Sequence, residues 1–294
     1  MSTRLRWIVL AYCTCAAVWG TTWYTVRASI GAGGYPTVEA AALRFALATL
    51  LLLPFAFRLR PRPATRAQWI WLTVAGVLDA VGYSLVYLGE ERVPGGLAAV
   101  LYATQPLILA LLLTATRMEP IRTSALAGAV ISFVGVGLIF HQRIDVSPRQ
   151  AVGIALVLGS VLASTLYTMI LKRHASGVHT VVSTTIFLAV TAICLWAVVL
   201  VQGGPHLPWP PPLGPSLAVL YLAVFGSVVA FITYIWLIEH VSLQASSTLV
   251  FVLPVIALVV DALFEREIRL EPSAYVGIAI TLGGLVVSLA ARRR

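Results

Sequence analysis

Two ionisable side chains, Arg44 and Asp79, lie deep inside long apolar stretches of the sequence. A charged group in such surroundings is costly, so each is a candidate functional group. If both stretches are helices crossing one layer, the two Cα atoms differ in depth by roughly 6 Å at about 1.5 Å of rise per residue. An arginine side chain can span that gap. We therefore expect Arg44 and Asp79 to pair, or one of them to meet the carboxylate or amine of a solute. A fixed ion pair between helices, with no role in binding, is the alternative.

Aromatic and amide side chains occur in the same apolar stretches. Trp19 and Trp23 are four residues apart and would share one face of a helix, as would Tyr83 and Tyr87. A buried Tyr or Trp needs a partner for its polar atom, and a cavity with aromatic walls suits apolar and aromatic groups. Plain helix packing is the alternative. The candidate binding set is Trp19, Trp23, Arg44, Asp79, Tyr83, Tyr87, Tyr102, Gln105, Tyr167 and Tyr234.

Catalytic and metal-binding patterns are missing from the sequence. The histidines fall between the apolar stretches or at their ends, and neither H-E-x-x-H nor G-x-S-x-G occurs. Cys13 and Cys15 form a C-x-C pair without the further ligands of a metal site. No glycine-rich loop carries a phosphate-binding signature. We expect no metal, no cofactor and no enzymatic activity.

The composition indicates what positions these groups. Of the 294 residues, 60% are hydrophobic and 11% are charged, and the mean hydropathy is +0.94. A soluble domain is nearer half apolar and a quarter charged. The sequence therefore predicts an all-α integral membrane protein. The net charge of +9 does not indicate nucleic-acid binding, because the arginines lie mainly in short segments between the apolar stretches.

Ten segments are long and apolar enough to be spanning helices of roughly 20 residues. They cover residues 7–26, 38–57, 69–89, 93–115, 122–140, 151–171, 181–201, 215–237, 242–263 and 272–290. If both termini are cytoplasmic, thirteen Arg and Lys residues face the cytoplasm and six face outward. This bias agrees with the positive-inside rule and predicts that orientation.

An internal repeat joins the two halves of the chain. The run 87–93 matches 235–241 at an offset of 148 residues, and Pro106 then meets Pro254 and Glu119 meets Glu267. With one inserted residue, Gly128 and Gly135 match Gly277 and Gly284. Five helices per half is an odd number, so the second half would enter the membrane in the opposite sense. We expect two inverted five-helix repeats, residues 1–145 and 146–294, with the site between them.

The two matching prolines would each kink the middle of a helix, because proline removes a backbone hydrogen bond. Pro106 and Pro254 are therefore candidate hinges for rocking between states, with static kinks as the alternative. The matching glycines would allow close helix contact.

Several motifs resemble a known family. The run Ala-Val-Trp19-Gly20-x-x-Trp23, the triplet around Arg44 and the twin Glu-x-Val…Pro hairpins resemble the drug/metabolite transporter superfamily, and within it the ten-helix EamA-type exporters. The likeness extends to bacterial aromatic amino-acid exporters. It implies a carrier in the bacterial inner membrane that moves amino acids, related metabolites or drugs outward through a central cavity. The segment 151–171 departs from the pattern, because Ser164, Thr165 and Tyr167 stand where a Trp-Gly pair is expected.

The function expected from these observations is secondary transport that exports aromatic or other apolar amino acids, or related small metabolites, by alternating access. A drug or other metabolite carrier of the same fold remains open, as does an intramembrane enzyme, which would need paired catalytic groups at membrane depth. The internal repeat argues against a receptor, and the sequence contains no filter motif of the kind that forms a channel. The expected partners are a small-molecule solute and the lipid bilayer, without nucleic acid, and the chain is expected to act as a monomer.

Overall fold

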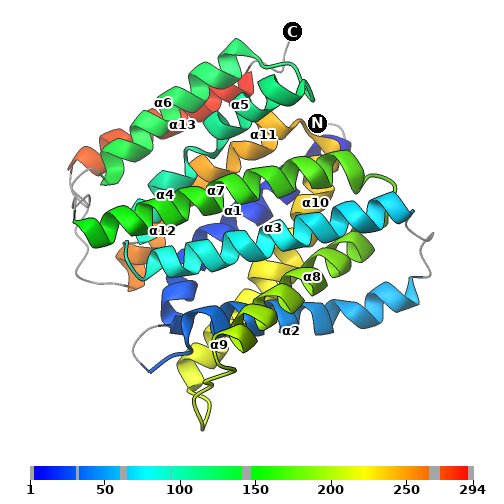
Figure 1. Cartoon of the computed structure of the whole chain (residues 1–294). Helices are drawn as coiled ribbons and strands as arrows, with labels where there is room; N and C mark the ends of the chain where they lie inside the picture. Colours follow the sequence, from blue (N-terminus) through cyan, green and yellow to red (C-terminus); the bar gives the residue numbers. More distant parts are fainter. Residues whose placement is uncertain are drawn as a thin grey trace.

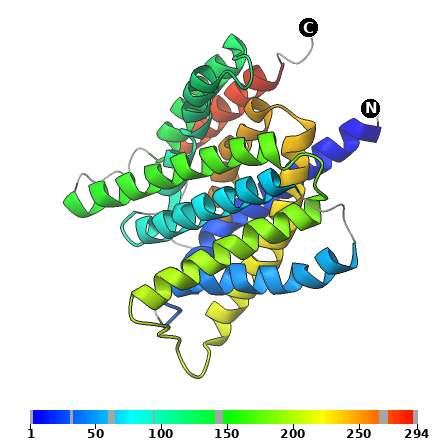
Figure 2. The same cartoon turned by 45° about the vertical axis from the view of Figure 1, so that its right-hand side comes forward.

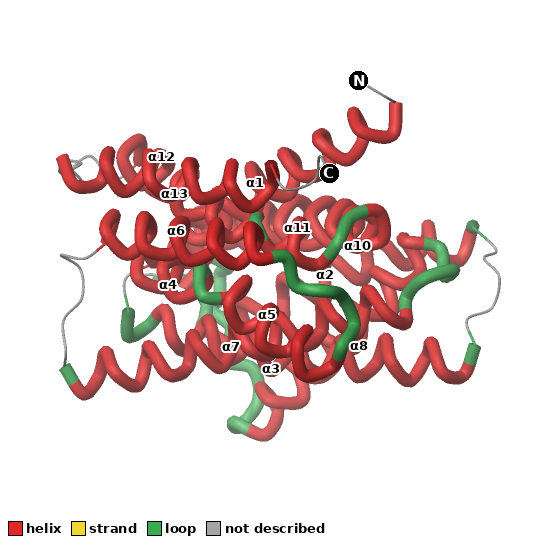
Figure 3. The backbone as a smooth tube through the Cα atoms, turned by 90° about the horizontal axis from the view of Figure 1, so that it is seen from above, coloured by secondary structure: helices red, strands yellow, loops and turns green. Residues whose placement is uncertain are grey.

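A computed structural model describes residues 3–30, 33–59, 65–93, 95–140, 147–264 and 272–290. These residues form helices joined by short loops and turns, with no strand among them (Figure 3). Figure 1 labels the α-helices, and the π-helical segment η2 lies between α9 and α10. The elements are α1 (Thr3–Ile30), α2 (Thr37–Arg58), α3 (Arg66–Glu90), α4 (Gly95–Tyr102), α5 (Gln105–Thr116), α6 (Thr123–Phe140), α7 (Pro148–His174), α8 (Thr180–Val201), α9 (Leu213–Tyr221), η2 (Leu222–Val229), α10 (Ala230–His240), α11 (Leu243–Ser247), α12 (Leu249–Phe264) and α13 (Pro272–Ala290).

Every predicted apolar segment is helical, but two of them are interrupted. The segment 93–115 divides into α4 and α5 at a turn formed by Ala103 and Thr104. The segment 242–263 divides into α11 and α12 at Thr248. The separators 265–271 and 141–146, which include Glu267 and the expected boundary between the halves, lie outside the described residues.

The two prolines differ in their helical context, which corrects the expectation of paired mid-helix kinks. Pro106 lies in the first turn of α5, where a missing N–H costs no intrahelical hydrogen bond. Pro254 lies inside α12. The chain therefore breaks before Pro106 but continues as a helix through Pro254.

Length and apolar composition single out five helical stretches of the described chain that could cross a membrane. They are α2, α3, α7, α8 and the continuous run Leu213–His240 formed by α9, η2 and α10. Shorter apolar helices cover Val100–Thr116, Thr123–Ile139, Leu243–Ala257 and Tyr275–Ser288. The first predicted segment lies within α1, which carries Arg4, Arg6 and Arg27.

The helices pack in pairs that join the first half of the chain to the second. Helix α6 packs along α13, α3 along α7 and α2 along α8. Figure 1 shows α7, α3 and α8 following one another across the front, and Figure 2 shows the same stack turned. Helix α1 runs behind them and contacts α9, α10 and α12. The start of α1 and the end of α13 both lie toward the upper right of Figure 2.

Glycines allow the close approach of α6 and α13. A Cβ on Gly128 would lie 2.5 Å from the carbonyl oxygen of Gly284, and a Cβ on Gly135 would lie 2.7 Å from that of Gly277. No side chain fits at such distances. Ser132 adds a hydrogen bond of 2.9 Å to the carbonyl oxygen of Thr281 across the same interface. This pair is therefore a backbone-to-backbone contact of the small-residue type that membrane helices use.

Candidate functional site

A cavity of about 110 Å³ lies between helices of both halves. That volume holds several water molecules, since one water needs about 10–15 Å³. All ten residues of the candidate binding set line it. The other lining residues are Thr22, Val26, Gly82, Val86, Glu90, Ser160, Ser164, Ser246, Leu249, Val250 and Leu253. Their role in binding a solute stays a prediction, but the expectation that they gather at one place agrees with the structure.

Helix α3 supplies one continuous wall of the cavity. Its lining residues recur every three or four positions, the spacing that keeps side chains on one face of a helix. From the deep end to the C-terminal end of α3 they are Asp79, Gly82, Tyr83, Val86, Tyr87 and Glu90. At about 1.5 Å of rise per residue this wall is roughly 16 Å long. We call its two ends the Asp79 end and the Glu90 end.

Arg44 of α2 is 1% exposed and is held by groups of the second half. Its Nε donates to Ser227 Oγ at 2.8 Å, and its Nη2 donates to the carbonyl oxygen of Gly226 at 2.9 Å. Nη2 also donates to Tyr83 Oη at 3.4 Å. The guanidinium carbon lies 5.1 Å from the ring centre of Phe45 and 4.9 Å from that of Tyr83, within cation–π range. Arg44 is thus well supplied with protein partners.

Asp79 is fully buried and has fewer partners. Its Oδ2 accepts a hydrogen bond of 3.0 Å from Thr191 Oγ1 of α8. Its Oδ1 has no hydrogen-bond partner. Among the described residues, Asp79 and Arg44 form no direct ion pair, although their charges interact electrostatically. The reason is that Arg44 is directed toward η2, whereas Asp79 is directed toward α8.

The aromatic walls come from α1, α4, α7 and α10. Trp19 packs edge-on against Tyr234 at 4.9 Å between ring centres, and Trp23 against Tyr102 at 5.2 Å. Trp19 Nε1 donates to the carbonyl oxygen of Gly226 at 3.3 Å, whereas Trp23 Nε1 has no partner. Such edge-to-face pairs fix the rings in place. The cavity is therefore bounded by rings whose orientations are set by one another.

Hydroxyl groups of α7 meet the polar side chains of the first half. Tyr102 Oη and Ser160 Oγ are hydrogen bonded at 2.5 Å, and Gln105 Nε2 donates to Ser164 Oγ at 3.2 Å. Tyr167, also of α7, packs near Phe187 with 5.4 Å between ring centres. Ser164, which the sequence marked as a departure from the family pattern, therefore lines the site.

Glu90 is the lining residue that sequence reasoning missed most clearly. In the sequence it lies in the charged stretch 90–92 between the predicted segments 69–89 and 93–115, which predicts a loop residue outside the site. In the structure Glu90 is the last residue of α3, lines the cavity, and has a buried Oε2 without a partner. Its spacing of eleven from Asp79 and seven from Tyr83 follows the helical repeat and could have revealed it.

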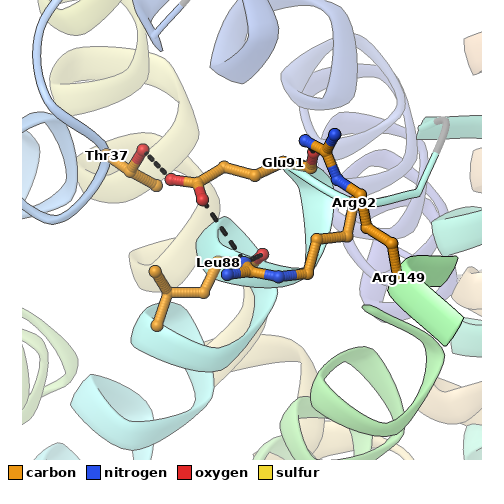
Figure 4. A network of polar contacts seen from close by, with 5 residues as sticks. All are labelled: Thr37, Leu88, Glu91, Arg92 and Arg149. Carbon is orange, nitrogen blue, oxygen red and sulfur yellow. Dashed lines mark hydrogen bonds and ion pairs between the residues drawn. The ribbon is translucent and has the colours of Figure 1, made fainter. Parts of the chain in front are cut away.

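A polar network lies beside the Glu90 end (Figure 4). Thr37 donates a hydrogen bond to the carboxylate of Glu91, and Arg92 Nη1 lies 3.3 Å from the other carboxylate oxygen. Arg92 Nη1 also donates to the carbonyl oxygen of Leu88 at 2.5 Å, and Arg149 Nη2 donates to that of Glu91 at 3.2 Å. The network therefore ties the ends of α2, α3 and α7 together, and its carboxylate is exposed.

Different contacts close the opposite end of the bundle. Lys172 Nζ donates to the carbonyl oxygens of Ile238 and Val241 at 2.5 and 2.8 Å. Tyr12 Oη and Thr248 Oγ1 are hydrogen bonded at 2.9 Å. These bonds tie α1 and α7 to the ends of α10 and α11.

The described residues offer no metal centre. No group of three or more His, Cys, Asp or Glu side chains in the described part of the chain could hold an ion. Pro106 and Pro254, the candidate hinges, do not line the cavity.

Comparison with known proteins identifies related sequences. A model of the EamA-like transporter family matches residues 5–141 and again residues 151–290. An uncharacterized inner membrane transporter of Escherichia coli K12, YedA, is 31% identical over 254 residues, covering 82% of this chain and 77% of YedA. The protein PecM of Dickeya dadantii is 27% identical over 284 residues, covering 94% of this chain and 92% of PecM. An uncharacterized transporter of Archaeoglobus fulgidus is 25% identical, covering 89% of this chain and 91% of its own length.

The fold is also similar to that of a protein of known crystal structure. The two superpose with a TM-score of 0.78 and cover 98% of each other, at 19% sequence identity. At this identity the likeness concerns the fold alone.

Proposed function

Since the chain belongs to the EamA-like transporter family, we propose that it is a secondary transporter of the inner membrane. It exports amino acids with aromatic or other apolar side chains, or related small metabolites, by alternating access through the central cavity. One observation carries the proposal. All ten residues of the candidate binding set line a single cavity between the halves of the chain.

The chemistry of the cavity supports an amphiphilic solute. Its walls include two tryptophans and five tyrosines, which suit an aromatic or aliphatic body. The cavity is also lined by the charged residues Arg44, Asp79 and Glu90, which can bind the polar group of a small solute. A solute that is apolar at one end and charged at the other, such as an apolar amino acid, uses both kinds of wall.

Helix bounds support the two inverted five-helix repeats. Adding 148 residues to the ends of α3 gives 214 and 238, close to the start of α9 and the end of α10. Adding 148 residues to the start of α4 gives 243, where α11 begins. Adding 148 residues to the end of α5 gives 264, where α12 ends. The family model also matches once in each half. The repeats proposed for residues 1–145 and 146–294 agree with both observations.

The contact between α6 and α13 supports the inversion itself. The repeat pairs Gly128 with Gly277 and Gly135 with Gly284. In the structure Gly128 contacts Gly284. Replacing each of these glycines by its counterpart in the other repeat gives Gly277 and Gly135, and these two residues are also in contact. A two-fold axis between the halves requires this reciprocity. With the interrupted helices each counted once, the repeats give ten spans with both termini on the same side.

The arrangement in the membrane follows from the loops. Thirteen Arg and Lys residues then face the side of the termini and six the other side, so we place both termini in the cytoplasm. The inner-membrane location rests on the similarity to YedA, which is described as an inner membrane transporter. With this orientation the Glu90 end of the cavity faces outward.

The test is flux through the purified protein. Reconstituted proteoliposomes should take up radiolabelled phenylalanine, tyrosine, tryptophan or leucine faster than protein-free vesicles, with and without a proton gradient. Uptake of drugs or other metabolites in the absence of any amino-acid flux would select the alternative carrier. Absence of flux across a broad panel would contradict transport.

The hinge role of the prolines has its own test. We propose that Pro106 and Pro254 let the interrupted helices bend as the cavity opens to alternate sides. The double variant Pro106→Ala, Pro254→Ala should then bind solute normally and transport it slowly. Full transport rate in the double variant would show that both prolines only shape a static bundle.

A further inference from the structure

We propose that Asp79 is a specificity-determining residue that binds the protonated amino group of the solute, so that the cavity selects cationic amine heads over carboxylate heads. This inference rests on the proposed transport function and names the chemical class of its solute. It starts from the unequal way in which the protein satisfies its buried cation and its buried anion.

The hydrogen-bond needs of Arg44 are largely met by the protein. Its Nε and Nη2 have acceptors on Ser227, Gly226 and Tyr83, and its flat face is covered by the rings of Phe45 and Tyr83. A buried guanidinium held in this way is already stabilised. Its Nη1 makes no hydrogen bond to a described residue, so this nitrogen is the part of Arg44 left for the carboxylate of a solute.

Asp79, by contrast, is short of donors. Thr191 Oγ1 lies 3.0 Å from Asp79 Oδ2, 3.0 Å from the carbonyl oxygen of Phe187 and 3.2 Å from that of Gly76. A threonine hydroxyl carries one hydrogen, so it cannot serve all three acceptors. Asp79 Oδ1 has no donor at all. The fully buried carboxyl group, which borders the cavity, therefore has one oxygen without a donor and another that shares a single hydroxyl hydrogen with two helix carbonyls.

An ammonium group supplies what is missing. It brings three N–H donors and a positive charge, whereas a carboxylate would bring only further acceptors and a like charge. The charged and titratable groups that face Asp79 do not replace it. They are Arg44 of α2, Tyr83 of α3, Tyr102 of α4 and Tyr167 of α7, and α8 contributes only Thr191. None of them donates a hydrogen bond to Oδ1.

Glu90 extends the same preference to the other end of the wall. Its Oε2 is buried without a partner, although Arg27 acts on the carboxylate electrostatically. An amine entering from the Glu90 end therefore meets one carboxylate on arrival and a second, more deeply buried one beyond Tyr83. The aromatic rings between them can also hold a cation by cation–π contact.

Three ligands with the same aromatic body test the inference. L-phenylalanine carries both charges, L-phenylalaninamide only the ammonium, and N-acetyl-L-phenylalanine only the carboxylate. Binding to the full chain in lipid nanodiscs is measured by calorimetry at about pH 6, where the amino groups are protonated. We expect the amide to bind within about threefold of phenylalanine and the N-acetyl compound at least about tenfold more weakly, since a charged hydrogen bond is involved.

A variant assigns the effect to one residue. Asp79→Asn should weaken amide binding by about tenfold or more and leave the N-acetyl compound unchanged. The matched control is Glu39→Gln, because Glu39 is also a buried acid, 7% exposed, but does not line the cavity. If Asp79→Asn fails to fold, the comparison of the three ligands on the unaltered protein still decides.

The outcomes separate this inference from the proposed function. Tighter binding of the N-acetyl compound than of the amide would overturn the inference while leaving amino-acid transport standing. Equal loss of amide binding in Asp79→Asn and Glu39→Gln would overturn the role of Asp79. Failure of all three ligands to bind would overturn both proposals.

Discussion

The two walls that the repeat places opposite one another, α3 to α5 and α9 to α12, share a backbone plan but differ in chemistry. At the offset of 148 residues, the lining residues Tyr102 and Gln105 correspond to Val250 and Leu253, which also line the cavity. Asp79 corresponds to Ser227, which is bonded to Arg44 rather than open to a solute. At positions 102 and 105 the first half therefore faces the cavity with polar groups, whereas the corresponding positions 250 and 253 of the second half carry apolar groups.

This difference gives the cavity a direction. A solute can place its charged head against α3 and its apolar body against α12, where Leu249, Val250 and Leu253 offer no polar side-chain group. Two identical walls would hold a solute equally well in two orientations. The repeat thus explains the shape of the bundle, and the divergence between its halves explains how one solute orientation is selected.

The largest effect is expected at Arg44, a residue of the first half that makes hydrogen bonds to groups of the second half. Arg44→Met removes three hydrogen bonds to Ser227, Gly226 and Tyr83, and leaves Asp79 without its nearby cation. We expect the free energy of unfolding to fall by about 3–5 kcal/mol, the usual cost of an uncompensated buried charge. Thermal unfolding in detergent measures it, and flux should be lost.

The control for this change is Arg58→Met, at the exposed C-terminal end of α2. It should alter stability by at most about 0.5 kcal/mol, as surface changes do. An Arg44→Met protein that melts like the unaltered protein and transports normally would show that the contact between halves at Arg44 is dispensable.

The parts of this comparison that the sequence predicted are those governed by composition and by side-chain type. The helices follow from apolar length, and Trp19, Tyr83 and Tyr102 could be assigned to a cavity because polar aromatics are conspicuous in apolar segments. The helical spacing of Asp79 and Glu90 was equally visible, but Glu90 was assigned to a separator by its charge.

The rest depends on contacts between distant parts of the chain. Ser227 and Gly226 lie more than 180 positions from Arg44, so no local pattern indicates that η2 and not α3 receives the guanidinium. The break between α4 and α5 was hidden for another reason. Proline is compatible with a mid-helix kink and with a first helical turn, and only packing decides between them.

The next effect in size concerns α6 and α13, the helices through which the halves touch most closely. In Gly135→Ala the new Cβ would lie 2.5 Å from the backbone nitrogen of Thr281, so the backbones must separate. Overpacking of this kind costs about 1–3 kcal/mol. Because Gly284 is the repeat counterpart of Gly135, Gly284→Ala should lower the thermal unfolding temperature by a similar amount.

Gly137→Ala is the matched control on the same helix, because no atom would lie within 4 Å of its new Cβ. We expect it to be neutral or to stabilise α6 by about 0.5–1 kcal/mol through helix propensity. Equal losses in Gly135→Ala and Gly137→Ala would mean that the interface is not set by backbone contact. A loss in Gly135→Ala alone would break the proposed equivalence of the two halves.

A smaller effect is expected when the polar wall is made to copy the apolar one. Gln105→Leu gives the first half the residue that the second half has at position 253 and removes the hydrogen bond to Ser164. We expect the affinity for phenylalanine to fall about fivefold, the equivalent of about 1 kcal/mol, because the side chain at position 105 can no longer offer a neutral hydrogen bond to the solute. Calorimetry in nanodiscs measures it, with little change in thermal unfolding.

The control is Leu253→Met at the corresponding position, a swap of similar volume that adds no hydrogen-bonding group at that wall. Its affinity should stay within about twofold of the unaltered protein. If Leu253→Met weakened binding more than Gln105→Leu, the apolar wall would contribute more to recognition than the polar one, and the orientation inferred for the solute would have to be reversed.

The smallest effect is expected at the network of Figure 4, where exposed charges tie the ends of α2 and α3 to the start of α7. Glu91→Gln keeps the shape of the side chain but removes its charge, and exposed ion pairs contribute about 0–1 kcal/mol. We therefore expect a fall of at most about 1 kcal/mol in the free energy of unfolding, and high salt should cancel it because salt screens exposed charges.

Lys172→Met provides the contrast, since Lys172 caps the end of α10 from a partly buried position through two carbonyl contacts. Its loss should be larger and less sensitive to salt, because buried charges are screened less. A salt-insensitive loss in Glu91→Gln as large as that of Lys172→Met would mean that both ends of the bundle are held with equal strength.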